Sequence, residues 1–273
     1  GSITTPVQNQ RPWRQHVMSV FDRAILGRFG VRRWDGIVSL DSVVVRYIER
    51  LYGPEAVARS RVIPFGIPKS SVELYREARV ERTEPPRIAF IGHIHPFRNP
   101  STLIAAMPRI LEKMPDARLE LVGRVGLQEP VQLARRLGLG EEKVRFRGPL
   151  GHDEVVEILK SAHVVAGWVT GPYPALGTAP REAMLCGTPV VSDIPSDLLG
   201  DGVLKPDENI VLVDSTSPVQ VGDALISLLS DEARRRKIGH AGREVVLDAL
   251  SWESIAAAMG EFYEEVLQRA GKR

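Results

Sequence analysis

The chain has 273 residues, of which 43% are hydrophobic and 26% charged, a composition typical of a globular protein with a substantial core. The formal net charge of +2 is too small to indicate nucleic-acid binding, so we expect no nucleic-acid partner. The single cysteine, Cys186, excludes an internal disulfide and fits a reducing compartment. No apolar run is long enough to span a bilayer. We therefore expect a cytoplasmic protein.

The N-terminal part contains one amphipathic pattern. In residues 13–29 the apolar side chains fall on one helical face and basic side chains on the other. Such a helix either packs on a neighbouring domain or makes peripheral contact with an anionic membrane, which would place the protein at the inner membrane face. The opening Gly1-Ser2 resembles a remnant of cloning, so we expect the native N-terminus to be absent.

Short strands and one helix are expected next. Residues 36–40 and 61–65 have the apolar character of buried strands. Ser42 is predicted to cap a helix that runs to about Leu51. The segment from Pro68 to Pro86 is polar, and no element is predicted there.

From residue 86 onward, apolar strand patterns alternate with helical patterns. The predicted strands are 87–91, 118–122, 144–147, 163–169, 189–192 and 210–213, and the predicted helices are 101–113, 128–137, 152–161, 179–186 and 217–229. This alternation predicts an α/β fold with a doubly wound, mostly parallel, Rossmann-like sheet. Ligands of such sheets bind at the carboxyl ends of the strands. Pro108 should kink the first of these helices.

The C-terminal part is predicted to be helical from about residue 231. The cationic run Arg234–Lys237 is interpreted as a solvated helix face. Ser251 is predicted to cap the last helix.

The stretch from 171 to 193 indicates an anion site. Thr178 is predicted to cap a short helix, and Gly187 to end it in a left-handed conformation. A helix that begins after a glycine-bearing loop presents free N–H groups and the positive end of its dipole, which suits phosphate. Glu182, one turn further, would reach ligand hydroxyls beside that phosphate. The alternative is an ordinary loop–helix–strand unit that binds nothing.

The loop after the first strand of the regular part offers cationic groups. Gly92 opens it, and His93 and Arg98 follow; the fork of the Arg98 guanidinium suits a diphosphate. The alternative is that the histidine is an ordinary loop residue and that Arg98 pairs with a surface acid. Gly148, after the third strand, would let a flat base approach the backbone, or it is a turn residue. No Cys/His cluster indicates a metal site, and we expect neither a metal nor another cofactor.

Three stretches together resemble the retaining glycosyltransferases of family 4, mainly their nucleotide-sugar domain. They are FIGHIHPFRNPSTLIAAMPRILEKMPDARLELVG, VRFRGPLGHDEVVEILKSAHVV and PREAMLCGTPVVSD. The resemblance extends from about Val62 to the final helix. It implies the GT-B fold, a hexosyltransferase-like activity, and a nucleotide-diphosphate sugar donor held between two Rossmann-like domains. The acceptor, whether glycan, lipid or small molecule, is not implied.

The resemblance also implies roles for individual residues. Glu182 matches the second glutamate of the family's E-x7-E motif, which binds the nucleotide ribose. Gly177, Thr178 and Ala179 match the backbone amides that hold phosphate. Arg98 stands where the family has a diphosphate-binding lysine, and His93 where it has an arginine. The Gly148 loop matches the turn that receives the base.

The sequence departs from the family at Pro174, where the first glutamate of E-x7-E is expected. The predicted domains are a remnant of the acceptor-side domain over 1–68, the nucleotide-sugar domain over 69–250, and a helix over 251–273 that packs back toward the N-terminal part. The leading hypothesis is the donor-binding part of a retaining glycosyltransferase, truncated or partial. The alternatives are a catalytically degenerate nucleotide-binding or interaction module, and another GT-B-like enzyme such as a nucleotide-sugar epimerase.

Overall fold

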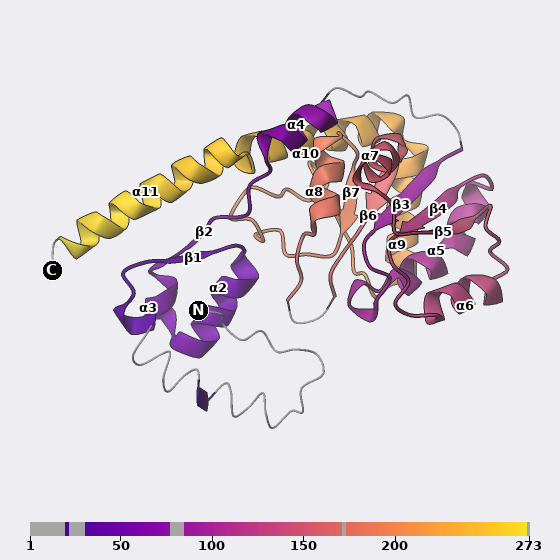
Figure 1. Cartoon of the computed structure of the whole chain (residues 1–273). Coiled ribbons are helices and arrows are strands. Elements are labelled where there is room, and N and C mark those ends of the chain that lie inside the picture. Colours follow the sequence, from indigo (N-terminus) through magenta and orange to yellow (C-terminus); the bar gives the residue numbers. More distant parts are fainter. Residues whose placement is uncertain (1–19, 22–30, 77–84, 171–172, 272–273) are drawn as a thin grey trace. The chain divides into compact units, whose positions relative to one another are not determined.

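The structure, a computed structural model, describes residues 20–21, 31–76, 85–170 and 173–271 (Figure 1). The amphipathic helix predicted over 13–29 lies outside these residues, apart from 20–21. The chain divides into two compact units, 1–64 with 256–273, and 65–255. None of the described helices combines the length and the apolar character needed to cross a membrane.

The larger unit is built on a six-stranded sheet in which every pair of neighbouring strands is parallel. The strand order is β5-β4-β3-β6-β7-β8. The bounds are β3 (Arg87–Ile91), β4 (Arg118–Val122), β5 (Val144–Gly148), β6 (Val164–Ala166), β7 (Val190–Ser192) and β8 (Val211–Leu212). The predicted doubly wound parallel sheet is therefore confirmed. Because all strands run the same way, their carboxyl ends meet at one edge.

Helices cover both faces of this sheet. Their bounds are α4 (Lys69–Arg76), α5 (Pro100–Lys113), α6 (Glu129–Arg136), α7 (His152–Ser161), α8 (Thr178–Leu185), α9 (Pro218–Ser230) and α10 (Glu232–Ala249). The chain steps outward from β3 to β5 and then returns to β6, so right-handed crossovers place α7 and α8 on the face opposite α5 and α6. Accordingly, α5 lies beside α6 and α9, whereas α8 lies beside α4, α7 and α10.

The core lies between these layers and is apolar. Phe90 of β3 and Trp168 after β6 are almost fully buried, and the α5 side chains Leu103, Met107 and Ile110 pack in the same cluster. Burial of this surface is the main stabilising contribution to the fold. The α5 helix continues through Pro108 without a break.

The ends of α8 confirm one prediction and correct another. Gly187 has φ 69°, as predicted, and its N–H donates to the Met184 carbonyl. At the other end the N-cap residue is Gly177, and Thr178 occupies the first helical position. The predicted Thr178 cap was wrong by one residue, because the extended backbone that a cap requires occurs at Gly177.

Two further predictions are corrected. The polar segment after Pro68 contains α4, which is anchored by Tyr75, a side chain only 1% exposed. The cationic run Arg234–Lys237 is not simply a solvated face. Arg235 is buried, and its guanidinium donates to the carbonyls of Leu228 and Leu229. These hydrogen bonds to carbonyls near the end of the neighbouring helix offset the cost of removing the guanidinium from water.

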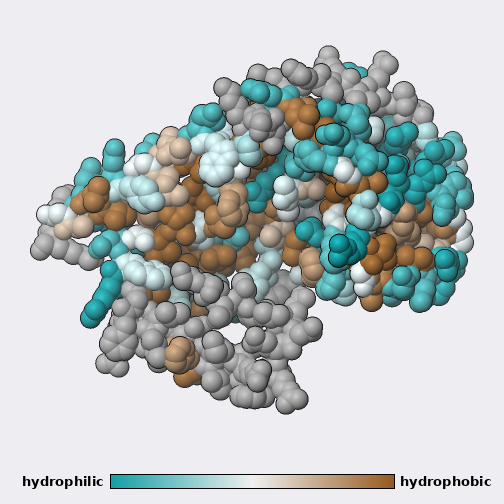
Figure 2. Space-filling model, in the orientation of Figure 1, coloured by the Kyte–Doolittle hydropathy of each residue, from teal (hydrophilic) through white to brown (hydrophobic). Residues whose placement is uncertain are grey.

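The smaller unit contains a two-stranded parallel sheet. Its elements are η2 (Val31–Arg33), β1 (Ile37–Ser39), α2 (Ser42–Tyr52), α3 (Pro54–Val57), β2 (Ser60–Val62) and the part of α11 (Trp252–Ala270) from residue 256 onward. The space beside Gly36 is filled by Phe262 and Val266 of α11. Over the part of the surface where Figure 1 shows α11, Figure 2 shows a gathering of apolar residues.

The caps of α2 and α11 were both predicted as serines. For α2 the prediction was wrong: the Asp41 carboxylate accepts from the Val44 N–H at 2.8 Å, and Ser42 is already helical. Aspartate at this position also complements the helix dipole. For α11 the prediction is confirmed, since Ser251 Oγ accepts from the Ser254 N–H at 3.1 Å.

Candidate functional site

The carboxyl ends of β3, β4 and β5 are joined by close backbone contacts. The Gly92 N–H donates to the Val122 carbonyl, and the Gly123 N–H donates to the Gly148 carbonyl. Gly123 has φ 137°, and a Cβ there would lie 2.1 Å from the Gly92 carbonyl oxygen. The loops after β3 and β4 therefore approach each other in a way that only glycine permits at this position. Gly123 was not among the predicted site residues, although its place directly after a strand is a usable signal.

The loop that contains Arg98 is held at the same edge. It forms a short 3₁₀ turn, η3 (Pro96–Arg98), followed by Asn99 in the left-handed region at φ 37°. The Asn99 amide donates to the Thr102 hydroxyl at 2.7 Å and to the Ser215 carbonyl at 3.1 Å. These bonds tie the loop to the start of α5 and to the segment after β8.

Arg98 brings two predicted parts of the site together. A Cβ on Gly92 would lie 3.1 Å from Arg98 Nε, and a Cβ on Gly177 would lie 3.3 Å from Arg98 Nη1. The guanidinium therefore lies against both the end of β3 and the N-terminal end of α8. Glycine at both positions leaves room for it.

Arg98 is a half-buried cation. Within the described residues its side chain forms no hydrogen bond and no ion pair, and its Nε is buried without a partner. Burial lowers the pKa of the Arg98 guanidinium, because removal from water disfavours the charged form. The centroid of the Phe97 ring lies 5.7 Å from Arg98 Cζ, and this cation–π contact offsets only a small part of the desolvation cost. An anion at this point would offset the desolvation.

The N-terminal end of α8 faces the same guanidinium. No side chain caps the helix at Gly177, and its first turn contains no acidic residue. The positive end of the helix dipole and the Arg98 charge therefore act in the same region. Thr178 is exposed, and Ala179 follows it in the first turn.

His93 and Gly148 also lie at the carboxyl edge of the sheet, since His93 follows β3 and Gly148 ends β5. His93 is exposed, and its Nε2 lies 2.9 Å from where a Gly126 Cβ would be, so the ring covers the loop after β4. Its ring centroid is 5.6 Å from that of His95. Gly148 ends β5 with φ 69°, and no atom lies within 4 Å of its Cβ position. Space is therefore open beside this turn.

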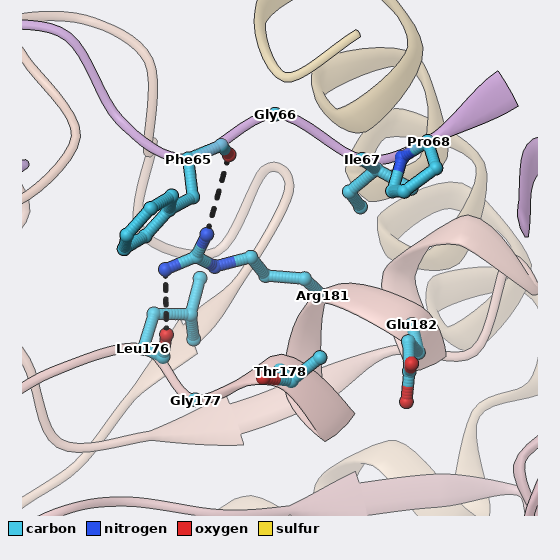
Figure 3. Close-up of a pocket in the computed structure, with 9 residues that line it drawn as sticks. All are labelled: Phe65, Gly66, Ile67, Pro68, Leu176, Gly177, Thr178, Arg181 and Glu182. Carbon is cyan, nitrogen blue, oxygen red and sulfur yellow. Dashed lines mark hydrogen bonds between the residues drawn. The ribbon is translucent and has the colours of Figure 1, made fainter. Parts of the chain in front are cut away.

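A pocket of about 310 Å³ lies beside Gly177, and Arg98 is not among the residues that line it (Figure 3). The residues that line it are Phe65, Gly66, Ile67, Pro68, Leu176, Gly177, Thr178, Arg181 and Glu182. Figure 3 shows Arg181 and Glu182, neighbours in sequence, pointing in different directions. The pocket therefore combines an apolar wall with one carboxylate.

Arg181 shapes this pocket and was missed by the sequence analysis. Its Nη1 donates to the Phe65 carbonyl at 3.3 Å, and its Nη2 donates to the Leu176 carbonyl at 3.0 Å. The side chain thereby fastens the 65–68 segment to the loop before α8. A carbonyl partner is not recognisable from a side-chain pattern, so the sequence held no direct signal for this role.

Metal-ligating groups are scattered in the part of the chain that the structure describes. There, no three His, Cys, Asp or Glu side chains are grouped so that they would hold a metal ion. The cations and N–H groups around Arg98 and Gly177 are suited to binding an anionic ligand directly.

The profile of the family described as "Glycosyl transferases group 1" matches residues 71–245, which is more than half of the chain. The chain belongs to this glycosyltransferase family. The match extends from α4 to α10 and includes the Arg98 loop, the Gly148 turn and α8.

Curated relatives of this glycosyltransferase chain include D-inositol 3-phosphate glycosyltransferases. The protein from Corynebacterium glutamicum is 29% identical over 218 residues, which cover 73% of this chain and 51% of the relative. The chain thus spans about half the length of the curated relatives that it matches.

Solved structures show that the fold of the glycosyltransferase chain matches that of GT-B glycosyltransferase domains. Sucrose-phosphate synthase from Thermosynechococcus elongatus is similar with a TM-score of 0.69 and 24% identity, over 96% of this chain and 65% of that chain. HepE from Anabaena, in complex with UDP-glucose, is similar with a TM-score of 0.70 and 19% identity, over 92% of this chain and 69% of that chain. At these identities the likeness concerns the fold alone.

Proposed function

We propose that this glycosyltransferase chain binds a nucleotide-diphosphate sugar at the carboxyl edge of its larger sheet. The sugar is transferred to an acceptor hydroxyl with retention of the anomeric configuration. The observation that supports this most directly is the half-buried Arg98 guanidinium against Gly92 and Gly177, which has no acceptor within the described residues. Family membership supports the reaction class. The UDP-glucose complex of HepE, a protein of similar fold, supports the ligand class.

Each residue of the site has a defined role in this proposal. Arg98 and the N–H groups of 177–179 bind the diphosphate, and His93 adds a hydrogen bond to it. Negative charge develops on the diphosphate as the sugar departs, and a fixed cation with a helix dipole stabilises that charge. These groups take the place of a metal ion, so transfer requires none.

The remaining contacts concern the nucleoside. Glu182, which lines the pocket beside α8, accepts hydrogen bonds from the ribose hydroxyls. The open space beside Gly148 receives the base, whose flat face approaches the backbone closely. Gly92 leaves room for Arg98.

The experiment that tests this proposal is calorimetric titration of the chain with UDP, GDP and their sugar conjugates. We expect saturable binding of one base series, and strong weakening in Arg98→Ala. Arg118→Ala is the matched control, because exposed Arg118 begins β4 at the opposite edge of the sheet. Absence of binding to every nucleotide, or equal loss in both variants, would refute the proposal.

A second candidate is a degenerate nucleotide-binding module, which Pro174 favours. Proline stands where the family's first E-x7-E glutamate is expected, and it lacks a carboxylate for sugar hydroxyls. Pro174→Glu discriminates between the two candidates. A gain of sugar-nucleotide affinity over nucleotide affinity in this variant, with an inactive wild type, would favour the module. Turnover by the wild type would favour the enzyme.

A further inference from the structure

We propose that Tyr75 is a positioning residue for Glu182. Its hydroxyl donates a hydrogen bond to the Glu182 carboxylate and holds that carboxylate in the orientation that receives ligand hydroxyls. This inference rests on the proposed function, because Glu182 is there the group that binds ribose.

The first observation is the burial of the Tyr75 hydroxyl. The side chain is 1% exposed, and no hydrogen bond of ordinary geometry reaches its hydroxyl from the described residues. Buried hydroxyl groups almost always have a partner, so this one calls for a nearby acceptor. The acceptor must belong to an element packed against α4.

The second observation is how firmly Tyr75 is held. The Nζ of buried Lys160 donates to the Leu74 carbonyl at 3.2 Å, which fastens α4 to α7. The His152 ring meets the Tyr75 ring edge-on, with centroids 6.2 Å apart and planes at 82°. The helix is therefore fastened through its backbone and the Tyr75 ring packs against one neighbour, so the hydroxyl has a defined position.

The third observation concerns what lies beside that position. Helix α4 packs against α8, and Glu182 is the one carboxylate in α8. Burial, together with the Glu182 charge, raises the pKa of the Tyr75 hydroxyl well above its usual value. At neutral pH the hydroxyl thus keeps its proton and is a donor, while the carboxylate is the acceptor.

A carboxylate held in this way remains available to a ligand. It has two oxygens and several lone pairs, so one bond from Tyr75 leaves acceptor capacity on the pocket side. Holding the long Glu182 side chain before a ligand arrives removes part of the entropic cost of binding. Tyr75 therefore sets how well the site distinguishes hydroxyl-bearing ligands.

The test compares UDP with 2′,3′-dideoxyuridine diphosphate, which lacks the ribose hydroxyls. We expect Tyr75→Phe to weaken UDP binding by about three- to tenfold, the range for loss of one hydrogen bond. Binding of the dideoxy probe should not change. Tyr263→Phe, at an exposed tyrosine, is the matched control. Equal weakening for both probes would show a merely structural role, and unchanged UDP binding would show no role; either result overturns the inference.

A ligand-free measurement separates this inference from the proposed function. In thermal unfolding, Tyr75→Phe should lower the Tm of the wild type but not that of Glu182→Ala, since the two changes remove the same bond. Additive losses would refute the hydrogen bond. If UDP fails to bind the wild type while this coupling is present, the proposed function alone fails.

Discussion

Two arginines contact the N-terminal end of α8, and they differ in what satisfies them. Arg181, within the helix, donates to the carbonyls of Phe65 and Leu176. Arg98, from the loop after β3, lies against Gly92 and Gly177 and forms no hydrogen bond or ion pair within the described residues. Buried donors with acceptors from their own chain contribute to the fold. A desolvated cation without one is better explained by a ligand.

The same contrast separates two groups of residues beside Gly177. We call the pocket lining the pocket flank, and the surroundings of the Arg98 guanidinium the Arg98 flank. The pocket flank is closed by hydrogen bonds within the chain and has an apolar wall. The Arg98 flank contains a fixed cation, an uncapped helix end and glycines that allow close approach. Residue type alone therefore does not separate a structural arginine from a ligand-binding one.

The largest effect on stability is expected for Gly123→Ala, which would disrupt the close contact between the loops after β3 and β4. Gly123 has φ 137°, and a Cβ there would lie 2.1 Å from the Gly92 carbonyl oxygen, a backbone atom that cannot easily move away. We expect the free energy of unfolding to fall by about 4 kcal/mol or more. Chemical denaturation measures this. Gly138→Ala is the control, because Gly138 has φ 68° with no atom within 4 Å. Similar losses in both variants would contradict the close contact.

The next largest effect is expected for Arg98→Ala. Loss of charge-assisted bonds to a diphosphate should weaken nucleotide binding by about ten- to hundredfold, or about 1.4 to 2.7 kcal/mol. The Tm should not fall, because the change removes a desolvated cation without a partner. Calorimetry and thermal unfolding are the two measurements. A lower Tm with unchanged binding would make Arg98 structural, like Arg181.

Arg181→Ala should show the converse. Removing its guanidinium leaves the Phe65 and Leu176 carbonyls without these bonds, and we expect a loss of about 1 to 3 kcal/mol in unfolding free energy. Affinity for inorganic diphosphate, which probes the Arg98 flank alone, should stay within about threefold of the wild type. Denaturation and calorimetry on the same sample decide this. Full stability with lost diphosphate binding would reverse the roles of the two arginines.

The last and smallest of these effects is expected for Gly148→Ala, in which stability should change little. Its φ of 69° costs an alanine about 1 kcal/mol, and the new Cβ meets no atom within 4 Å. If a base packs there, nucleotide binding should nevertheless fall, whereas inorganic diphosphate binding should not. Gly202→Ala, with φ 75° and equally open space, is the matched control. Unchanged nucleotide affinity would remove Gly148 from the site.

Some of the misses in the prediction share one cause. Tyr75 lies in a segment that is polar as a whole, so no element was predicted there, yet its ring is buried and packs against His152. Arg235 lies in a cationic run, yet it is buried against two helix-end carbonyls. In each case the deciding partners come from another helix. The local sequence pattern reports the polarity of a segment, whereas the burial of a side chain depends on which distant residues the fold places against it.

The class of fold follows from the sequence alone. Apolar strand patterns that alternate with helical patterns can bury their apolar faces together in a parallel, doubly wound sheet covered by helices. The sequence also determined the Gly187 turn, which depends only on local backbone conformation. Tertiary structure alone decided that Arg181 has carbonyl acceptors and that Arg98 has no acceptor within the described residues. Gly177 is far along the chain from Gly92 and Arg98, and Arg98 lies between the two glycines only because β3 and α8 meet at one edge of the sheet.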